Sequence, residues 1–491
     1  MYSKHTEKFL GYALTYDDVL VVPEYSSVFP RDTDLTTQLA PNIRLNIPFI
    51  TAAMDTVTEW EMAIAVAREG GVGFIHKNLS IEEQAQQVRK VKRAESGVIR
   101  DPITLSEDAT VGDALSIMEE HNIRGIPVVD ANGKLKGIVT NRDLRFESER
   151  HRPIRQIMTP IERIITAQSD VTLNEAEVLF REHKVEKLPL VDSNGYLRGL
   201  ITFRDIKRLK EFPHACKDTH GRLRVGAAVG ITPDVMERVA ELVRAEVDII
   251  TVDSAHGHSQ KVLETIRNIK NAFPELPIVG GNVATGEGAL AVVDAGADTV
   301  KVGVGPGSIC TTRIIAGIGI PQLQAVFEVS QALKGRNIPI IADGGIRHTG
   351  DVVKAIVAGA DAVMAGSIFA GVEEAPGDTI VYEGRKFKTY RGMGSIEAMK
   401  EGASDRYFQD PEEAIKKLVP EGIVGRVPYK GTFSEVIFQF VGGLRSGMGY
   451  TGSRTIAELK QKRFVIITLA GVRESHPHDV DIVRSAPNYM P

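Results

Sequence analysis

The chain has 491 residues, 43% of them apolar and 25% charged, and a formal net charge of −5, which are ordinary values for a globular protein of two to four domains. Its charged residues form no basic block, so we expect no dedicated nucleic-acid site, and any phosphate should be bound locally. The polar first eighteen residues are unlike a signal peptide, and no apolar run approaches the ~20 residues of a membrane helix, so we expect a cytoplasmic protein without a membrane anchor.

Apolar runs alternate with helical stretches along most of the chain. The runs that we expect to be strands are 48–53, 72–76, 225–229, 248–253, 277–281, 299–304, 338–342 and 362–366. They are continuous Val, Ile, Ala and Gly runs, which are typical of parallel strands buried on both faces. Periodic apolar patterns between them, such as 58–69 and 233–246, predict helices. Eight such units predict an α/β fold, a (β/α)₈ TIM barrel.

An internal repeat lies between the second and third of these units. Residues 126–143 recur 62 residues later at 188–205, with ten of eighteen positions identical. Each copy has an Asn-Gly pair between apolar runs, which predicts a β-hairpin. We expect an inserted α+β module over 93–205, with copies at 93–152 and 153–205, inside a barrel formed by 1–92 and 206–491.

The repeat resembles a tandem CBS pair, the Bateman module. That resemblance implies that a Thr and an Asp of each copy hold the ribose of a regulatory purine nucleotide such as ATP or GTP. Here these residues are Thr140, Asp143, Thr202 and Asp205. The alternative is that they only cap a strand-to-helix turn, which is an ordinary role for Thr and Asp.

A barrel of this type carries its chemistry at the C-terminal ends of its strands. Asp253 ends the fourth expected strand, and Asp343 follows the seventh. The loops after strands seven and eight are the usual phosphate site, which Gly345, Gly366 and Ser367 fit. Asp343 would bond a pair of ribose hydroxyls, or else satisfy local N–H groups as a turn carboxylate.

Cys310 follows the sixth expected strand in a loop rich in glycine. The other cysteine is Cys216, and two cysteines make no disulfide framework, which fits a reducing compartment. Glycines give a ligand room to approach, and backbone N–H groups shift a thiol toward the nucleophilic thiolate. The alternative is a small buried apolar side chain. The neighbouring glycines, Ser308 and two threonines favour a nucleophile.

Residues 372–431, after the eighth expected strand, contain few long apolar stretches and many Gly, Lys, Arg and Glu. A structureless stretch of this length in a compact domain is more often functional than idle. We interpret it as a flap. The alternative is a surface excursion with solvated charges.

Several motifs together make the chain similar to IMP dehydrogenase. They are GVGPGSICTTR around Cys310, ADGGIR at 342–347, GSIFAG at 366–371, YRGMGS at 390–395, SDRYF at 404–408 and PEGI at 420–423. The resemblance covers essentially the whole chain, including the repeat and ESHPHD at 474–479. Lys301 and Glu421 resemble the bacterial members.

The resemblance implies NAD-dependent oxidation of IMP to XMP, the committed step of guanine nucleotide synthesis. The Cys310 thiolate would attack C2 of the purine, hydride would leave for NAD, and water would hydrolyse the thioimidate. Arg406 would activate the water, with Tyr407 sharing the proton, although a guanidinium ordinarily stays protonated. A relay through Thr312 and Glu421 is the alternative.

The resemblance also implies the binding residues. Those for IMP are Ser308, Asp343, Gly344, Gly345, Gly366, Ser367, Tyr390, Arg391, Gly392, Met393, Gly394 and Glu421. Those for NAD are Asp253, Gly303, Val304 and Gly305. A potassium ion would be held by carbonyls of Gly305, Gly307 and Cys310, joined by Glu474, Ser475 and His476 of a neighbouring subunit. The family is typically a homotetramer, and some members pair into octamers.

Two rival functions follow from the same residues. GMP reductase shares the barrel and the cysteine, but its usual pattern lacks Arg406-Tyr407 and it commonly lacks the CBS insertion. A nucleotide-sensing regulatory protein would keep the module and lose the chemistry, whereas Cys310, Thr312 and Glu421 are all present.

Overall fold

The computed structural model describes residues 8–94, 99, 102–121, 123–409, 418–484 and 486–489, without the side chains of 205, 208 and 209. The chain divides into two compact units. One comprises 1–92, 214–218 and 223–491, and the other comprises 93–213 and 219–222. Among the described residues, no helix is both long and apolar enough to cross a bilayer.

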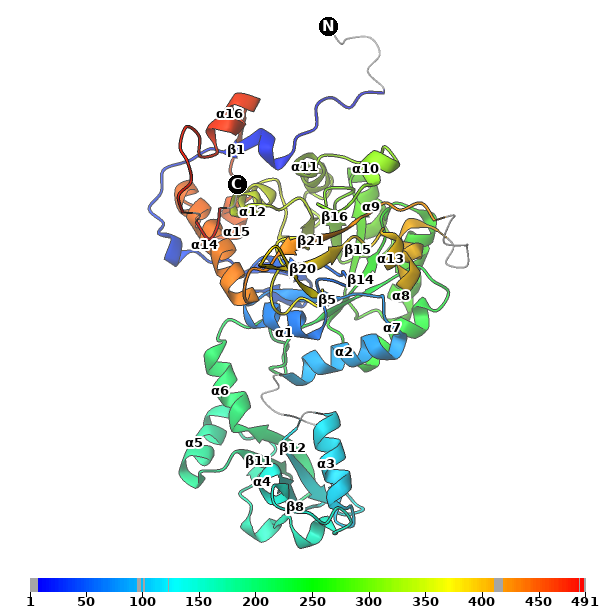
Figure 1. Ribbon diagram of the computed structural model, residues 1–491, viewed down its shortest axis with the longest axis vertical. Coiled ribbons are helices and arrows are strands. Elements are labelled where there is room, and N and C mark those ends of the chain that lie inside the picture. Colours follow the sequence, from blue (N-terminus) through cyan, green and yellow to red (C-terminus); the bar gives the residue numbers. More distant parts are fainter. Residues whose placement is uncertain are drawn as a thin grey trace. The chain divides into compact units, whose positions relative to one another are not determined.

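The first unit is built on a closed barrel of eight parallel strands (Figure 1). In barrel order the strands are β4 (Phe49–Thr51), β5 (Val72–Ile75), β13 (Gly226–Val229), β14 (Ile249–Asp253), β15 (Ile278–Val283), β16 (Thr299–Val302), β17 (Ile340–Asp343) and β18 (Ala362–Ala365). Each of the eight expected strands is present, and the predicted (β/α)₈ barrel is confirmed.

Helices follow the strands and cover the outside of the barrel. They are α1 (Trp60–Arg68), α2 (Ile81–Ala94), α7 (Val235–Arg244), α8 (Gln260–Ala272), α9 (Gly286–Asp294), α11 (Gln322–Ala332), α12 (Thr349–Val357) and α14 (Phe433–Thr451). Their ends are set by local chemistry. Thr432 and Glu435 form a capping box at the start of α14, and Gly452 ends it with a positive φ of 65°.

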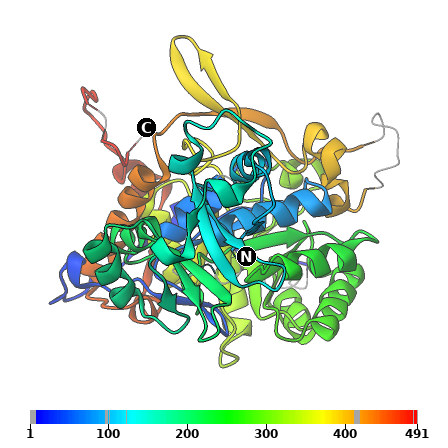
Figure 2. The same cartoon turned by 90° about the horizontal axis from the view of Figure 1, so that it is seen from below.

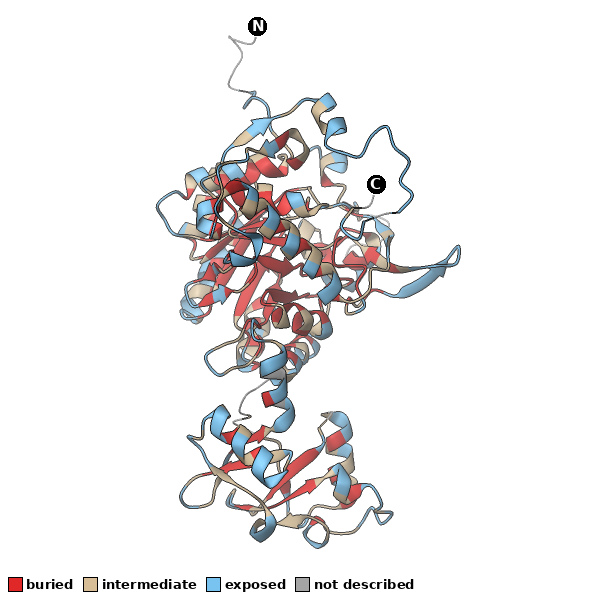
Figure 3. Ribbon diagram, turned by 90° about the vertical axis from the view of Figure 1, so that its left-hand side faces the viewer, coloured by how far each residue is buried: buried red, intermediate tan, exposed pale blue. Residues whose placement is uncertain are grey.

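A β-hairpin closes the end of the barrel opposite the strand C-termini. It consists of β2 (Thr37–Ala40) and β3 (Ile43–Leu45), whose apolar side chains share one core with residues inside the barrel. The hydroxyl of Thr299, the first residue of β16, donates to Leu39 O. Figure 3 shows the barrel strands as the buried centre of this unit. The hairpin covers this end of the barrel, so a ligand would enter from the other end, at the C-terminal rim of the strands.

The segment 372–431, which we call the flap, has secondary structure of its own, so the expectation of a structureless stretch is wrong. Strands β19 (Thr379–Tyr382), β20 (Arg385–Arg391) and β21 (Val424–Pro428) form an antiparallel sheet, and short helical turns span 396–407. Figure 2 shows the β19–β20 hairpin, in yellow, projecting outward. All four residues of β19 are exposed, so the strand carries no buried apolar period. It pairs with β20, and the Tyr382 ring contacts Phe387 and Arg426.

The second unit contains the two repeat copies. The first copy is α3 (Val111–Glu120), β7 (Gly125–Val129), β8 (Leu135–Thr140) and α4 (Asn141–Leu144). The second is α5 (Leu173–His183), β11 (Lys187–Val191), β12 (Leu197–Thr202) and α6 (Phe203–Glu211). Both predicted hairpins are present, and their turns meet reciprocally. Leu135 N donates to Gly195 O at 3.1 Å, and Leu197 N donates to Gly133 O at 3.2 Å.

The copies have separate apolar cores, one under α3 and the other under α5. The unit extends past the expected end at residue 205, which falls within α6, to residue 213.

Candidate active site

A cavity at the C-terminal rim of the barrel collects side chains from several strand ends and from the flap. Its lining includes all five residues expected to be catalytic: Cys310, Thr312, Arg406, Tyr407 and Glu421. It also includes Asp253, Asp343, Gly344, Gly366, Tyr390, Gly392, Met393 and the loop Gly303–Gly307. Residues separated by more than 150 positions therefore line one space.

The Cys310 loop leaves β16 through backbone conformations that require glycine. Gly303 and Gly305 have positive φ angles of 150° and 78°, and a Cβ on Gly303 would overlap Asp343 O. Gln322 fixes the start of the loop, because its Nε2 donates to Val302 O at 2.8 Å and to Asp343 O at 3.1 Å. The strand ends of β16 and β17 are thereby tied together beside the thiol.

Cys310 is half-buried, and its Sγ lies 3.2 Å from Thr312 Oγ1. The backbone on either side of it pairs with the flap. Thr311 N donates to Glu421 O at 2.9 Å, and Ile423 N donates to Ile309 O at 3.1 Å. These contacts bring the Cys310 loop and Glu421, 111 positions apart in the printed sequence, to adjoining places in the cavity.

A third segment completes the pairing. Gly392 N donates to Ile423 O, and Glu421 N donates to Gly394 O, both at 2.9 Å. A Cβ on Gly392 would lie 3.1 Å from Ile309 O, so a larger residue here would crowd this backbone pairing. Residues 390–394 and 420–423, two separate motifs in the sequence, thus form one wall.

Tyr390 is buried at this wall, and its hydroxyl interacts with Ser308. Burial raises the pKa of the Tyr390 phenol, so it stays neutral at physiological pH. A Cβ on Gly366 would lie 2.7 Å from the Tyr390 hydroxyl oxygen. Arg391, by contrast, points its guanidinium to Asp55, with Nη2 2.8 Å from Oδ2, and also contacts Glu401.

The residues expected to bind the substrate, including those for its phosphate, do not all line the same depression. Gly344 and Gly366 line the main cavity. Ser308, Gly345 and Ser367 line a neighbouring one, together with Arg347 and Arg313. Arg347 is paired there with Asp17, and Arg313 donates to Val304 O and Ile320 O, so an anion in this depression would rely on glycine and serine groups.

Lys301 is the centre of a buried charge network that sequence reasoning did not assign to the site. Its Nζ lies 2.9 Å from Asp253 Oδ1 and 3.0 Å from Asp343 Oδ2, and it also contacts Asn282 Oδ1. Asn282 Nδ2 in turn donates to Asp343 Oδ2 at 2.8 Å. Only 2% of the Lys301 side chain is exposed. In the sequence, Lys301 stands in the apolar run Thr299–Val302. A lysine inside such a run indicates that acidic or polar side chains are buried beside it.

Arg406 enters this network from the flap. Its guanidinium forms an ion pair with Asp253, and Ala255 N donates to its carbonyl at 3.0 Å. Its Nε is buried without a hydrogen-bond partner among the described residues. Burial raises the pKa of the neighbouring Tyr407, and Arg406 opposes that rise. The site thus holds a neutral phenol beside a guanidinium with one unused donor.

The residues expected to bind potassium fall into two places. Gly305 and Gly307 lie in the Cys310 loop, where Cys310 N donates to Gly307 O at 3.1 Å. Glu474 ends α16 (Leu469–Glu474), and Ser475 and His476 follow it. Among the described residues, no cluster of three or more His, Cys, Asp or Glu side chains fits a metal ion.

In the inserted unit, Thr140 and Asp143 contact each other. Thr140 Oγ1 donates to Asp143 Oδ2 at 2.7 Å, and Thr140 N donates to the same oxygen at 2.8 Å, which caps α4. Thr202 ends β12 in the second copy, and the Asp205 side chain lies outside the described part of the chain. Lys187 approaches the first copy, because a Cβ on Gly125 would overlap its side chain.

Comparison with known proteins identifies the family. The family model described as IMP dehydrogenase / GMP reductase domain matches residues 13–478. The chain is 58% identical over 487 residues to the inosine-5'-monophosphate dehydrogenase of Aquifex aeolicus, covering 98% of this chain and 99% of that protein. Identity to the Bacillus subtilis enzyme of the same name is 55% over 485 residues, with the same coverage.

Among solved structures, a GMP reductase from Trypanosoma brucei in complex with guanosine 5'-monophosphate is similar. Its TM-score is 0.89 and its identity 40%, over 97% of this chain and 100% of that one. Because so little of the chain is left unmatched, the similarity includes the inserted unit. The presence of the inserted unit therefore does not distinguish an IMP dehydrogenase from a GMP reductase.

Proposed function

Because the chain belongs to the IMP dehydrogenase family of oxidoreductases, we propose that it oxidises IMP to XMP with NAD through a covalent intermediate on Cys310. The observation that carries this proposal is the single cavity in which Cys310, Thr312, Arg406, Tyr407 and Glu421 meet. An oxidation followed by a hydrolysis needs a nucleophile and a water-activating group at the same carbon.

Cys310 supplies the nucleophile. Its thiolate attacks C2 of the purine and forms a C–S bond, and loss of a hydride from C2 to NAD would then oxidise that carbon. The thioimidate that remains is cleaved by water, which breaks the C–S bond, returns the thiol and gives XMP. The hydroxyl of Thr312, 3.2 Å from Sγ, is placed to bond either the sulfur or the incoming water.

IMP would bind along the Cys310 side of the rim. Asp343, held by Asn282 and Lys301, presents a carboxylate for the ribose hydroxyls. The depression lined by Ser308, Gly345 and Ser367 would take the phosphate. The purine would then lie between these residues and the thiol, beside Gly392, Met393 and Gly394.

NAD supplies a hydride acceptor when bound. Asp253, whose buried carboxylate is directed into the cavity, would hold ribose hydroxyls of the nicotinamide half, with the Gly303–Gly305 backbone beside it. These residues fit the group, because the Asp253 carboxylate and the Gly303, Val304 and Gly305 backbone line one cavity. The same carboxylate binds Arg406, so the flap and the dinucleotide exclude each other there.

Water activation would follow closure of the flap. Arg406 and Tyr407 line the cavity together, so both would face a water molecule that enters it. The relay through Thr312 and Glu421 remains the alternative, because both line the same cavity. A carboxylate is the more conventional proton acceptor.

A potassium ion would be held by the backbone carbonyls of Gly305, Gly307 and Cys310. The positive φ of Gly305 marks a sharp turn in this loop. Glu474, Ser475 and His476 of a neighbouring subunit in a homotetramer would complete the site. Such an ion would hold the Cys310 loop in one conformation.

The inserted unit, which we take as 93–213, would bind regulatory purine nucleotides such as ATP or GTP. Arg142 and Arg124 lie close enough to Lys187 to lower its pKa, although burial is the largest cause. This basic group beside Thr140 and Asp143 suits phosphates. Pairing of two tetramers through these units would give an octamer. We place the enzyme in the cytoplasm, at the committed step of guanine nucleotide synthesis.

Mixing the protein with IMP and NAD and following NADH absorbance tests the proposal. Steady NADH formation that requires IMP is expected. The similarity to the GMP reductase structure favours one second candidate, the reductive deamination of GMP with NADPH. NADPH consumption with GMP, and no NADH formation with IMP, would replace our assignment with that one.

A further inference from the structure

Lys77 lies in the corner between β5 and α2, and its ammonium group forms an ion pair with Asp405 of the flap. Both side chains are buried, with 6% of Lys77 and 10% of Asp405 exposed. Among the residues that the structure describes, Asp405 is the only carboxylate within ion-pair distance of Lys77. The second Asp405 oxygen accepts a hydrogen bond from Ile231 N at 3.1 Å, so one flap side chain contacts two barrel loops.

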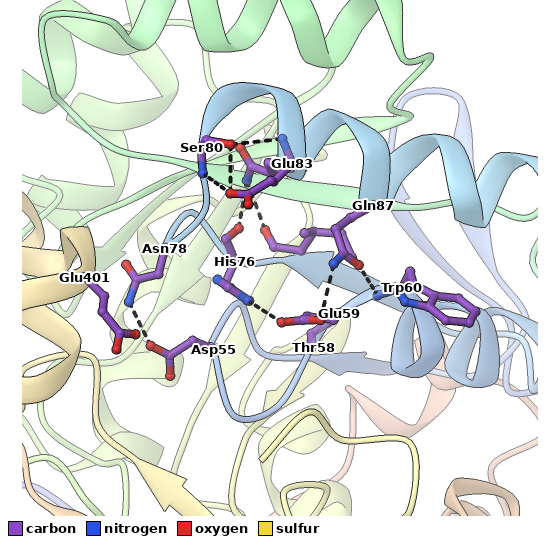
Figure 4. A network of polar contacts seen from close by, with 12 residues as sticks. Asp55, Thr58, Glu59, Trp60, His76, Asn78, Ser80, Glu83, Gln87 and Glu401 are labelled. Atoms are coloured by element: carbon purple, nitrogen blue, oxygen red, sulfur yellow. Dashed lines mark hydrogen bonds and ion pairs between the residues drawn. The ribbon is translucent and has the colours of Figure 1, made fainter. Parts of the chain in front are cut away.

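The residues on either side of Lys77 have partners of their own. His76 Nε2 lies 3.3 Å from Glu59 Oε1, and Asn78 Nδ2 donates to Asp55 Oδ2 at 2.8 Å. Figure 4 shows these two residues, which flank Lys77 in the sequence, turned toward different partners on the barrel. Asn78 has partners on both the barrel and the flap, because its Nδ2 also donates to Ala398 O at 3.4 Å and Arg391 of β20 binds Asp55. The Lys77 backbone is therefore fixed on both sides, and its side chain is presented at a defined place.

Electrostatics favour the docked flap at this point. Burial lowers the pKa of Lys77, Arg406 and Arg238 lower it further, and Asp405 opposes all three. Removal of Asp405 would leave Lys77 as a buried cation close to other cations, which is strongly unfavourable. The space is also shaped for the carboxylate, because a Cβ on Gly230 would overlap it.

Asp405 directly precedes Arg406, and both lie in one short helical turn over Ser404–Tyr407. Fixing Asp405 at Lys77 therefore fixes the backbone that carries Arg406 to Asp253, and Ala255 N secures the same turn at the Arg406 carbonyl. We propose that Lys77 and Asp405 are positioning residues that latch the closed flap, so that Arg406 stays in place during hydrolysis. The kinetic part of this inference rests on the proposed function.

Hydrogen–deuterium exchange tests the latch independently of activity. The amides of Ile231 and Ala255 donate to the flap, so opening of the flap exposes them. In Lys77→Met and Asp405→Asn we expect the Ala255 amide to exchange about tenfold faster than in the unmodified protein. Unchanged exchange in both variants would overturn the latch. Should Lys77→Met fail to fold, Asp405→Asn tests the same contact from the flap.

Kinetics then separate positioning from a general structural role. Rapid mixing with IMP and NAD should still give a full NADH burst in both variants, followed by a steady rate about tenfold slower. Excess NAD should inhibit at lower concentration, because an open flap leaves Asp253 free for the dinucleotide. A reduced burst with an unchanged steady rate would contradict the latch. Absence of NADH with the unmodified protein would contradict the proposed function instead, and the exchange measurement would still stand.

Two further variants sharpen the test. Lys77→Met/Asp405→Asn should be no slower than the slower single variant, because both substitutions remove one contact, and multiplied effects would overturn the pairing. Lys462→Met is the matched control. It removes an ion pair with Glu24 at 2.9 Å, outside the flap, and should leave both the exchange at Ala255 and the burst kinetics unchanged.

Discussion

Arg406, on the flap, forms an ion pair with Asp253, the last residue of β14. Asp253 is also the residue that we assign to the nicotinamide ribose, so one carboxylate has two partners that cannot bind together. Lys301 Nζ contacts the other carboxylate oxygen of Asp253, Oδ1, at 2.9 Å. With Arg406 docked, the two carboxylates Asp253 and Asp343 are balanced by two cations. Without it, the network carries an excess negative charge facing the cavity, which attracts the positively charged nicotinamide ring.

Arg406→Ala should slow hydrolysis of the covalent intermediate by about 100-fold or more, because general acid–base and electrostatic contributions are of that size. Hydride transfer should change much less, since the flap is displaced during that step. Stopped-flow absorbance should therefore show a burst close to one NADH per active site and then a slow steady rate. A lost burst would place Arg406 in the first step.

Lys301→Met should lower the free energy of unfolding by about 3–5 kcal/mol, because it leaves the buried Asp253 and the partly buried Asp343 without the cation that lies between them. Thermal unfolding measured by circular dichroism checks this. Lys462→Met, at a more exposed ion pair, should change stability by about 0–1 kcal/mol. Equal effects of the two substitutions would show that Lys301 does not organise the rim.

The two cysteines should differ sharply toward alkylation. Burial raises the pKa of the Cys216 thiol to about 12, so its reactive thiolate is scarce until the pH nears that value. Cys310 lines the open cavity. At pH 8 iodoacetamide should modify Cys310 alone, and IMP should protect it. Labelling of Cys216 in the folded protein should begin only as the pH rises toward 12, and its labelling at pH 8 would contradict the burial.

Deletion of residues 93–213, bridged by a short linker, should leave an active barrel. Residues 214–218 must be kept, because Cys216 N donates to Ala67 O at 2.7 Å and Lys92 lies 2.9 Å from Asp218. What should disappear is any response of activity or oligomer size to ATP or GTP. An inactive but folded deletion protein would show that the module contributes to catalysis, and a retained response would place the effector site elsewhere.

The barrel was predictable because its strands are buried on both faces and read as continuous apolar runs. The repeat was predictable because 126–143 and 188–205 share ten of eighteen residues. The flap sheet was not, because β19 is exposed and its pairing leaves no apolar period. A strand without a buried face gives no alternation of apolar and polar residues that could be recognised in the sequence.

Site residues were predictable only where they stand in a local sequence motif. Cys310 stands in a glycine-rich loop, and Arg406 and Tyr407 form a recognisable pair. The contact between Lys77 and Asp405 had no such signal, because the two residues lie 328 positions apart in the sequence. Sequence also placed Gly345, Ser308 and Ser367 with the other substrate residues, whereas the structure puts them in an adjoining depression. Contacts between distant segments are set by the fold and cannot be read from spacing.

The central claim is a covalent bond between Cys310 and the purine, and acid quenching followed by peptide mass spectrometry tests it most directly. Protein mixed with IMP and NAD should be quenched after the burst, when Arg406→Ala should hold most of the intermediate. We predict that the peptide containing Cys310 then carries the added mass of the oxidised nucleotide, and that Cys310→Ser shows no adduct and no turnover. NADH formation by Cys310→Ser at the unmodified rate, or a burst without any adduct on Cys310, would contradict the account.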